Sequence, residues 1–176
     1  MHGFLIFVLL LLTGPAWGQS LSDAVLRQVK SDPAPFLDLA ANLIHGFGGA
    51  RGIDRVGVDR FVALERAEGR ASALRRLQVA DLNFDGAITR DEMAVLVAAA
   101  AAKSRGRLWA LFERADGSGD AVVKADEMLA YGRTEAMTSF SVADEALVRS
   151  VLTFDANADG LVALDEVRAA VAALGT

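Results

Sequence analysis

Three stretches of this chain repeat one twelve-residue pattern in which acidic and polar residues alternate around a tight turn. They read DLNFDGAITRDE from Asp81, DGSGDAVVKADE from Asp116 and DANADGLVALDE from Asp155. Their starts lie 35 and 39 residues apart, a spacing that accommodates one helix-loop-helix unit per repeat. The repeat therefore predicts helical units joined by loops that share one chemistry.

The spacing of oxygen-bearing side chains in the first and third loops suits calcium, a hard cation that takes six to eight oxygen ligands. Side chains at positions 1, 3 and 5 of a tightening turn point at a common centre. Glycine at position 6 permits the positive φ of the turn. Position 7 offers its backbone carbonyl, and Glu at position 12 reaches back to bind with both oxygens. The predicted ligands are Asp81, Asn83, Asp85, Ala87 and Glu92 in the first loop and Asp155, Asn157, Asp159, Leu161 and Glu166 in the third.

The middle loop departs from this pattern at two positions. Ala121 replaces the glycine at position 6, where a Cβ at positive φ costs about 1–2 kcal/mol. Lys124 at position 9 places an ammonium where a water or an oxygen is needed. Metal binding and a metal-free loop of the same shape both stay open here, so we expect two calcium sites and leave a third undecided. The candidate ligands are Asp116, Ser118, Asp120, Val122 and Glu127.

At every diagnostic position the first and third loops resemble the EF-hand family of calcium-binding proteins, to which calmodulin belongs. The resemblance implies an all-α fold of paired helix-loop-helix units, four units in two lobes. Because EF-hands pair, the loops at Asp116 and Asp155 are expected to pair with each other. The loop at Asp81 then needs an upstream partner, and Gly46 to Gly57, with Ile53 at position 8, fits a degenerate unit without ligands. The expected pairs span residues 33–104 and 105–176.

Helix boundaries follow from proline, glycine and apolar spacing. No proline follows Pro35, which favours long helices. Glycine predicts a possible interruption at Gly69 and a boundary between the two halves at Gly106. Ser141 with Asp144 or Glu145 predicts a capping box. The expected helices cover residues 33–44, 58–80, 91–103, 107–115, 125–131, 142–154 and 164–174.

The first residues predict export. Phe4 to Leu12 are nine apolar residues in a row, too few for a bilayer span of about 20 residues. Ala16-Trp17-Gly18 then offers small residues at the spacing of a signal-peptidase site. We expect a signal peptide over 1–18, an N-terminal segment over 19–32, and a periplasmic or secreted protein with no stable membrane span after cleavage. A buried apolar helix or an uncleaved anchor is the alternative.

Composition excludes several classes of function. The chain lacks cysteine, which excludes disulfides and thiolate metal sites, and its net charge of −5 includes no basic block for nucleic acid. No nucleophile elbow or phosphate loop appears, so we expect no enzyme. The leading expectation is calcium binding with a structural or buffering role outside the cytoplasm. The alternatives are a calcium-dependent regulator of an unidentified protein partner and a non-catalytic subunit of an enzyme.

Overall fold

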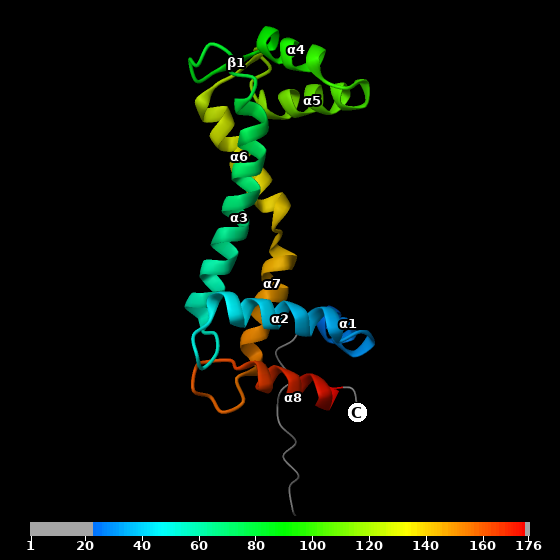
Figure 1. Ribbon diagram of the computed structural model, residues 1–176, viewed down its shortest axis with the longest axis vertical. Coiled ribbons are helices and arrows are strands. Elements are labelled where there is room, and N and C mark those ends of the chain that lie inside the picture. The colour runs from blue at the N-terminus through cyan, green and yellow to red at the C-terminus, as the bar shows by residue number, and fades with distance from the viewer. Residues whose placement is uncertain (1–22, 175–176) are drawn as a thin grey trace, which may run out of the picture. The chain divides into compact units, whose positions relative to one another are not determined.

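The computed structural model describes residues 23–174, and these are mostly helical, which confirms the all-α prediction (Figure 1). The expected signal peptide and its cleavage site lie outside the described residues. None of the described helices has the length and apolar character needed to cross a membrane. The helices are α1 (Asp23–Ser31), α2 (Ala34–Phe47), α3 (Arg55–Gln78), α4 (Arg90–Ala99), α5 (Ala102–Ala115), α6 (Ala125–Ser139), α7 (Val142–Ser150) and α8 (Leu164–Leu174), with a 3-10 turn η1 (Val151–Phe154).

The chain divides into two compact units, and their boundaries differ from the expected ones. Among the described residues, unit 1 holds residues 23–54 and 149–174, and unit 2 holds Arg55 to Val148. The expected division into 33–104 and 105–176 is therefore wrong. The 81–92 and 116–127 loops both lie in unit 2, whereas Ile53 and the 155–166 loop both lie in unit 1.

The pairing of the loops explains this division. Strand β1 (Ile88–Thr89) pairs antiparallel with β2 (Val122–Val123), and Ile88 lies opposite Val123. In unit 1 an isolated bridge joins Ile53 to Val162, whose backbone groups exchange hydrogen bonds of 3.0 and 2.8 Å. Ile53 thus occupies the bridging position that its register predicted. The expected pairing of the Asp116 loop with the Asp155 loop is wrong, because each bridges a different partner.

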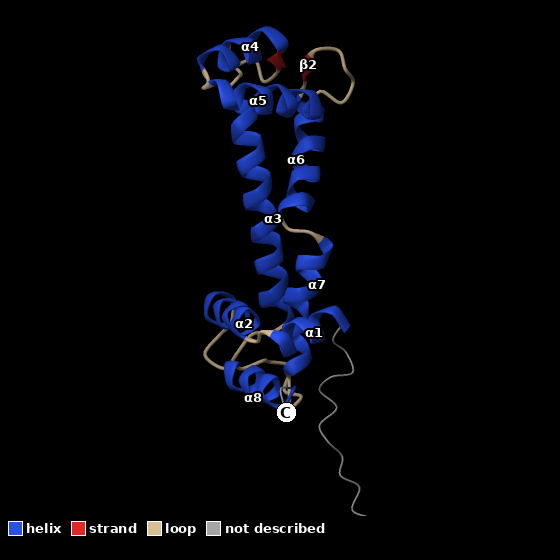
Figure 2. Cartoon of the chain, turned by 90° about the vertical axis from the view of Figure 1, so that its right-hand side faces the viewer, coloured by secondary structure: helices blue, strands red, loops and turns tan. Residues whose placement is uncertain are grey.

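Unit 2 is built on α3 and α6, which run side by side in Figures 1 and 2. The predicted interruption at Gly69 is absent, because this glycine serves helix packing. A Cβ on Gly69 would lie 1.7 Å from the Ser139 hydroxyl oxygen. Gly132 similarly faces Leu74, with its missing Cβ 3.3 Å from a leucine methyl. Helix α6 continues to Ser139, well beyond the expected end at Tyr131.

The expected single helix over 91–103 is in fact two helices, α4 and α5. Ala100 and Ala101 are extended, with ψ of 152° and 143°, although an alanine run favours helix. The bend lets α4 and α5 pack together, so that Met93 and Phe112 are both fully buried in one core. Arg105 compensates the end of α4 by donating to the Ala100 carbonyl at 3.1 Å. Tertiary packing has outweighed local propensity, and Gly106 lies inside α5.

Unit 1 packs α2 against α8, and its core includes the ring of Phe36 5.5 Å from that of Phe154.

The expected helix over 142–154 is confirmed as far as Ser150 and then tightens into the 3-10 turn η1. The capping box is confirmed with Asp144, whose carboxylate accepts from the Ser141 N–H at 2.8 Å and its hydroxyl at 2.6 Å. The helix over 164–174 is as predicted.

The bridge in unit 1 depends on Gly52, and its replacement should be costly. Gly52 has φ of 136°, and a Cβ there would lie 2.4 Å from the Val162 carbonyl oxygen. We expect Gly52→Ala to lower the free energy of unfolding by about 2–3 kcal/mol, because both backbone strain and collision result. Gly46→Ala is the matched control, since a Cβ meets nothing within 4 Å. Urea titration compares the two, and equal losses would contradict this account.

Candidate metal-binding loops

The three acidic loops share one backbone conformation. Each has two residues at positive φ, at loop positions 4 and 6. The angles are 60° and 81° at Phe84 and Gly86, 74° and 68° at Gly119 and Ala121, and 57° and 82° at Ala158 and Gly160. The prediction that Ala121 lies at positive φ is confirmed. Sequence reasoning missed position 4, where the middle loop has the glycine and the other two have a Cβ. Each loop therefore carries one strained residue, and the middle loop is not the more strained one.

The position-12 glutamates fold back over the start of their loops in all three cases. One carboxylate oxygen accepts a backbone N–H near the loop start, and the other accepts the N–H of position 9. Ten residues separate Leu82 from Glu92, so this contact closes the whole loop. The first set of distances is 3.1 Å from Leu82 to Glu92, 2.8 Å from Ser118 to Glu127 and 3.0 Å from Ala156 to Glu166. The second is 2.9 Å from Thr89, 3.0 Å from Lys124 and 2.9 Å from Ala163.

The carboxylates at positions 1 and 5 turn inward in the same way. Position 1 accepts the N–H of position 6 at 3.1 Å in Asp81, 3.0 Å in Asp116 and 2.9 Å in Asp155. Position 5 accepts the N–H of the residues predicted to supply carbonyl ligands, at 2.9 Å from Ala87, 3.0 Å from Val122 and 2.9 Å from Leu161. The amide oxygens of Asn83 and Asn157 accept the N–H of position 5 at 3.0 and 2.8 Å. Each loop thus holds its predicted ligands around one turn.

One oxygen in the 81–92 loop has no partner. Asp81 Oδ1 is buried and accepts no hydrogen bond, although the other oxygen of the same carboxylate is bonded to Gly86. A buried carboxylate oxygen without a partner is costly. A cation in the loop would satisfy it, so the residues present fit an oxygen-bound metal.

Hydrogen bonds to the glutamates favour their charged forms. The N–H and hydroxyl of Thr89 hold the pKa of Glu92 below its usual range. The N–H groups of Lys124 and Ser118 lower the pKa of Glu127 in the same way. Thr89, at position 9 of the loop, is the N-cap of α4 and forms a capping box with Glu92. The position-12 carboxylates are thus fixed by the first turn of the helix that follows.

The middle loop has an internal ion pair, which sequence reasoning missed. The Lys124 ammonium donates to Asp120 Oδ2 and lowers the pKa of that carboxyl. Asp116, Asp120 and Glu127 each place one oxygen within 4.8 Å of the others. Among residues 23–174 this is the one group of three acidic side chains so close together. The spacing of four residues between Asp120 and Lys124 could have indicated this ion pair, but from the sequence the lysine was considered only as unfavourable for metal binding.

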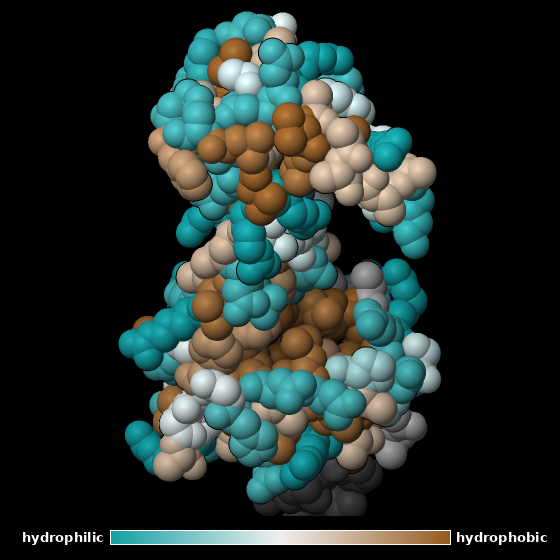
Figure 3. Space-filling model, turned by 45° about the horizontal axis from the view of Figure 1, so that its top comes forward, coloured by the Kyte–Doolittle hydropathy of each residue, from teal (hydrophilic) through white to brown (hydrophobic). Residues whose placement is uncertain are grey.

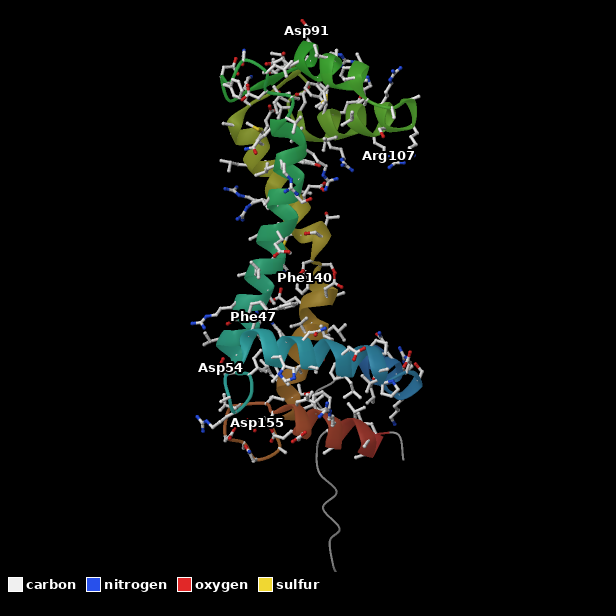
Figure 4. All side chains as sticks on the ribbon, viewed as in Figure 1. Phe47, Asp54, Asp91, Arg107, Phe140 and Asp155 are labelled. Atoms are coloured by element: carbon white, nitrogen blue, oxygen red, sulfur yellow. The ribbon has the colours of Figure 1, made fainter. Side chains whose placement is uncertain are left out.

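The segment that bridges to the 155–166 loop lacks this chemistry. A tight turn joins Gly49 to Gly52 through hydrogen bonds of 2.8 and 3.2 Å. Asp54 is the one carboxylate in the whole segment of residues 46–57. Figure 4 labels Asp54, which follows the bridging residue Ile53, and Asp155, which opens the 155–166 loop. Ile53 supplies the bridge of this segment, and its assignment as a degenerate unit without ligands stays a prediction.

Exchanging the residues at the two positive-φ positions of the middle loop tests its geometry. Ala121→Gly should raise the free energy of unfolding by about 1 kcal/mol, because it relieves a Cβ at φ of 68°. Gly119→Ala should lower it by a similar amount, since Gly119 has φ of 74°. The double variant should match the native chain within about 0.5 kcal/mol. Denaturant titration in a chelator measures all three, and a double variant weaker than both singles would contradict the shared-strain account.

No family model, curated protein or solved structure matches this chain.

Proposed function

We propose that this chain is a non-enzymatic calcium-binding protein of the EF-hand type, with sites in the 81–92 and 155–166 loops. The observation that carries the proposal is the closure of both loops by their last residue. Glu92 and Glu166 reach back over ten residues to the loop start, which is where a ligand that binds with both oxygens must lie. The partnerless oxygen of Asp81 supports a cation in the first of these loops.

The proposed ligands follow the loop positions. Carboxylates at positions 1, 5 and 12, an asparagine oxygen at position 3 and the carbonyl at position 7 give the oxygen-rich set that calcium prefers. In the 155–166 loop Ala163 at position 9 has no side-chain oxygen, so a water completes the set there. Calcium would offset the repulsion among three carboxylates in each loop and tie each loop to the helix that follows it.

Calorimetric titration of the purified protein with calcium tests this proposal. We expect two sites per chain, in the range of about 10⁻⁴–10⁻³ M typical of extracellular modules. Titration with magnesium is the control, because that smaller ion demands a nearly ideal octahedron and binds such loops less well. Fewer than two calcium sites would sink the proposal.

Export belongs to the same proposal and sets the role. Calcium outside the cytoplasm is abundant, so sites in this range would be largely filled, which favours a structural or buffering role. We expect the exported protein to start at Gln19, because Ala16-Trp17-Gly18 precedes it with the spacing of a cleavage site. Intact-mass measurement of the protein from the external fraction checks this, and retention of residues 1–18 would contradict it.

A calcium-dependent regulator is the second candidate, and one observation favours it. Phe84, at the tip of the 81–92 loop, is 90% exposed, and Leu82 beside it is 49% exposed. Apolar side chains also gather in patches between polar ones on the face drawn in Figure 3. If calcium presents such surface to a partner, an apolar dye should bind more strongly once calcium is added, and should bind less to Phe84→Ser. Dye binding that is the same with and without calcium would dismiss this candidate.

A further inference from the structure

The middle loop, residues 116–127, differs from the other two acidic loops because one of its carboxylates is paired with a lysine of the same loop. Lys124 lies at position 9, and its ammonium bonds the carboxylate of Asp120 at position 5. The position-9 residues of the other loops, Thr89 and Ala163, carry no charge. All three loops have acidic residues at positions 1, 5 and 12, but Lys124 is the one cation within a loop that is bonded to one of these carboxylates in the described residues. The other cation within a loop is Arg90, and its guanidinium lies over the ring of Trp109.

The acidic side chains are also arranged differently. Those of Asp116, Asp120 and Glu127 converge to within 4.8 Å, and no other three acidic side chains in the described part of the chain do so. Like charges at this separation repel, and a nearby opposite charge removes the penalty. The converging carboxylates therefore occur in the loop that contains Lys124. The acidic side chains of the 81–92 and 155–166 loops, which match the calcium pattern better, do not come as close together.

We propose that Lys124 supplies the 116–127 loop with an internal cation, so that this loop folds without metal and acts as a fixed support for the 81–92 loop. The second half of this statement rests on the proposed calcium site at 81–92. The chain would then bind one ion in each unit, although it has three acidic loops.

The contacts between the loops show how the support reaches the neighbouring site. Ile88 pairs with Val123 and Thr89 with Val122, and the Arg90 N–H donates to the Ala121 carbonyl at 3.0 Å. Thr89 in turn donates through its N–H and hydroxyl to Glu92 Oε2. A middle loop held closed by Lys124 thus fixes the strand from which the position-12 glutamate of the proposed site is oriented.

Replacing the lysine tests the idea with calcium as the probe. In Lys124→Thr the middle loop loses its cation and keeps all its ligands, so calcium should take the vacated place. We expect native protein to show two sites by calorimetry and Lys124→Thr to show three. Lys124→Arg, which keeps the charge, should stay at two. Lys103→Thr, which removes an exposed lysine on α5, is the matched control and should also stay at two.

A second measurement does not depend on calcium binding elsewhere. In a chelator, Lys124→Thr should melt about 1–3 °C below native protein and below Lys103→Thr, because the clustered carboxylates then repel without compensation. Calcium should more than restore that difference. Three sites in native protein, or a Lys124→Thr variant that stays at two sites with an unchanged midpoint in chelator, would overturn the inference. Native protein that binds no calcium would instead refute the proposed function, while the midpoint in chelator still decides the role of Lys124.

Discussion

Replacing Glu92 or Glu166 by Gln should each remove one calcium site and leave the other. The substitution keeps the size of the side chain and one of its oxygens but removes the charge that binds with both oxygens. Mutating a residue that only hydrogen-bonds a metal ligand typically lowers metal affinity by about 10–100-fold. We therefore expect the loss of a direct ligand to lower calcium affinity by at least that much. Calorimetry should show the native two sites reduced to one in each variant and to none in the double variant.

The backbone offers probes that assign each loss to its loop. The N–H of Gly86 donates to Asp81 and that of Gly160 to Asp155, so these two amides report on the two proposed sites separately. Glu92→Gln should abolish the calcium-dependent shift of Gly86 alone, and Glu166→Gln that of Gly160 alone. Glu113→Gln, an exposed change on α5 outside the three loops, is the control. Binding that survives unchanged in both variants would mean that these glutamates are not ligands.

Much of each candidate site could be predicted from sequence because its geometry is local. Twelve residues contain their own ligands, their turn and the helix start that positions the last glutamate. Ala121 was expected at positive φ and has it, and the capping interaction at Ser141 was predicted from the nearby acidic residues. The strain at position 4 was missed, because Phe84 and Ala158 give no hint of it by residue type.

The features that sequence could not supply are non-local. Gly69 and Gly106 read as interruptions, yet one serves close helix packing and the other lies inside a helix. The alanine run after Val97 has every local reason to continue as helix and bends because Met93 and Phe112 are buried together. Pairing of the loops is the clearest case. The four bridging residues are all β-branched, so nothing in their chemistry says which two will meet. They are Ile53, Ile88, Val123 and Val162.

That pairing leads to the prediction with the largest effect on stability. Ile53 is fully buried and bridges Val162, so Ile53→Ala should lower the free energy of unfolding by about 2–5 kcal/mol, the range for isoleucine in a core. It should also weaken calcium at the 155–166 loop, although Ile53 belongs to a segment without ligands. The amide of Gly160 should then need more calcium to shift, and that of Gly86 should titrate as in native protein.

Val123→Ala is the counterpart in unit 2 and separates the two possible pairings. Val123 is fully buried and lies opposite Ile88, so its truncation should weaken calcium at the 81–92 loop and shift the titration of Gly86. Pairing of consecutive loops, as the sequence alone suggested, would instead move the titration of Gly160. The two variants remove apolar atoms from equivalent positions of two different loops, so each controls for the other. Because each bridge joins only its own two loops, a crossed result in either variant would contradict the coupling derived from this fold.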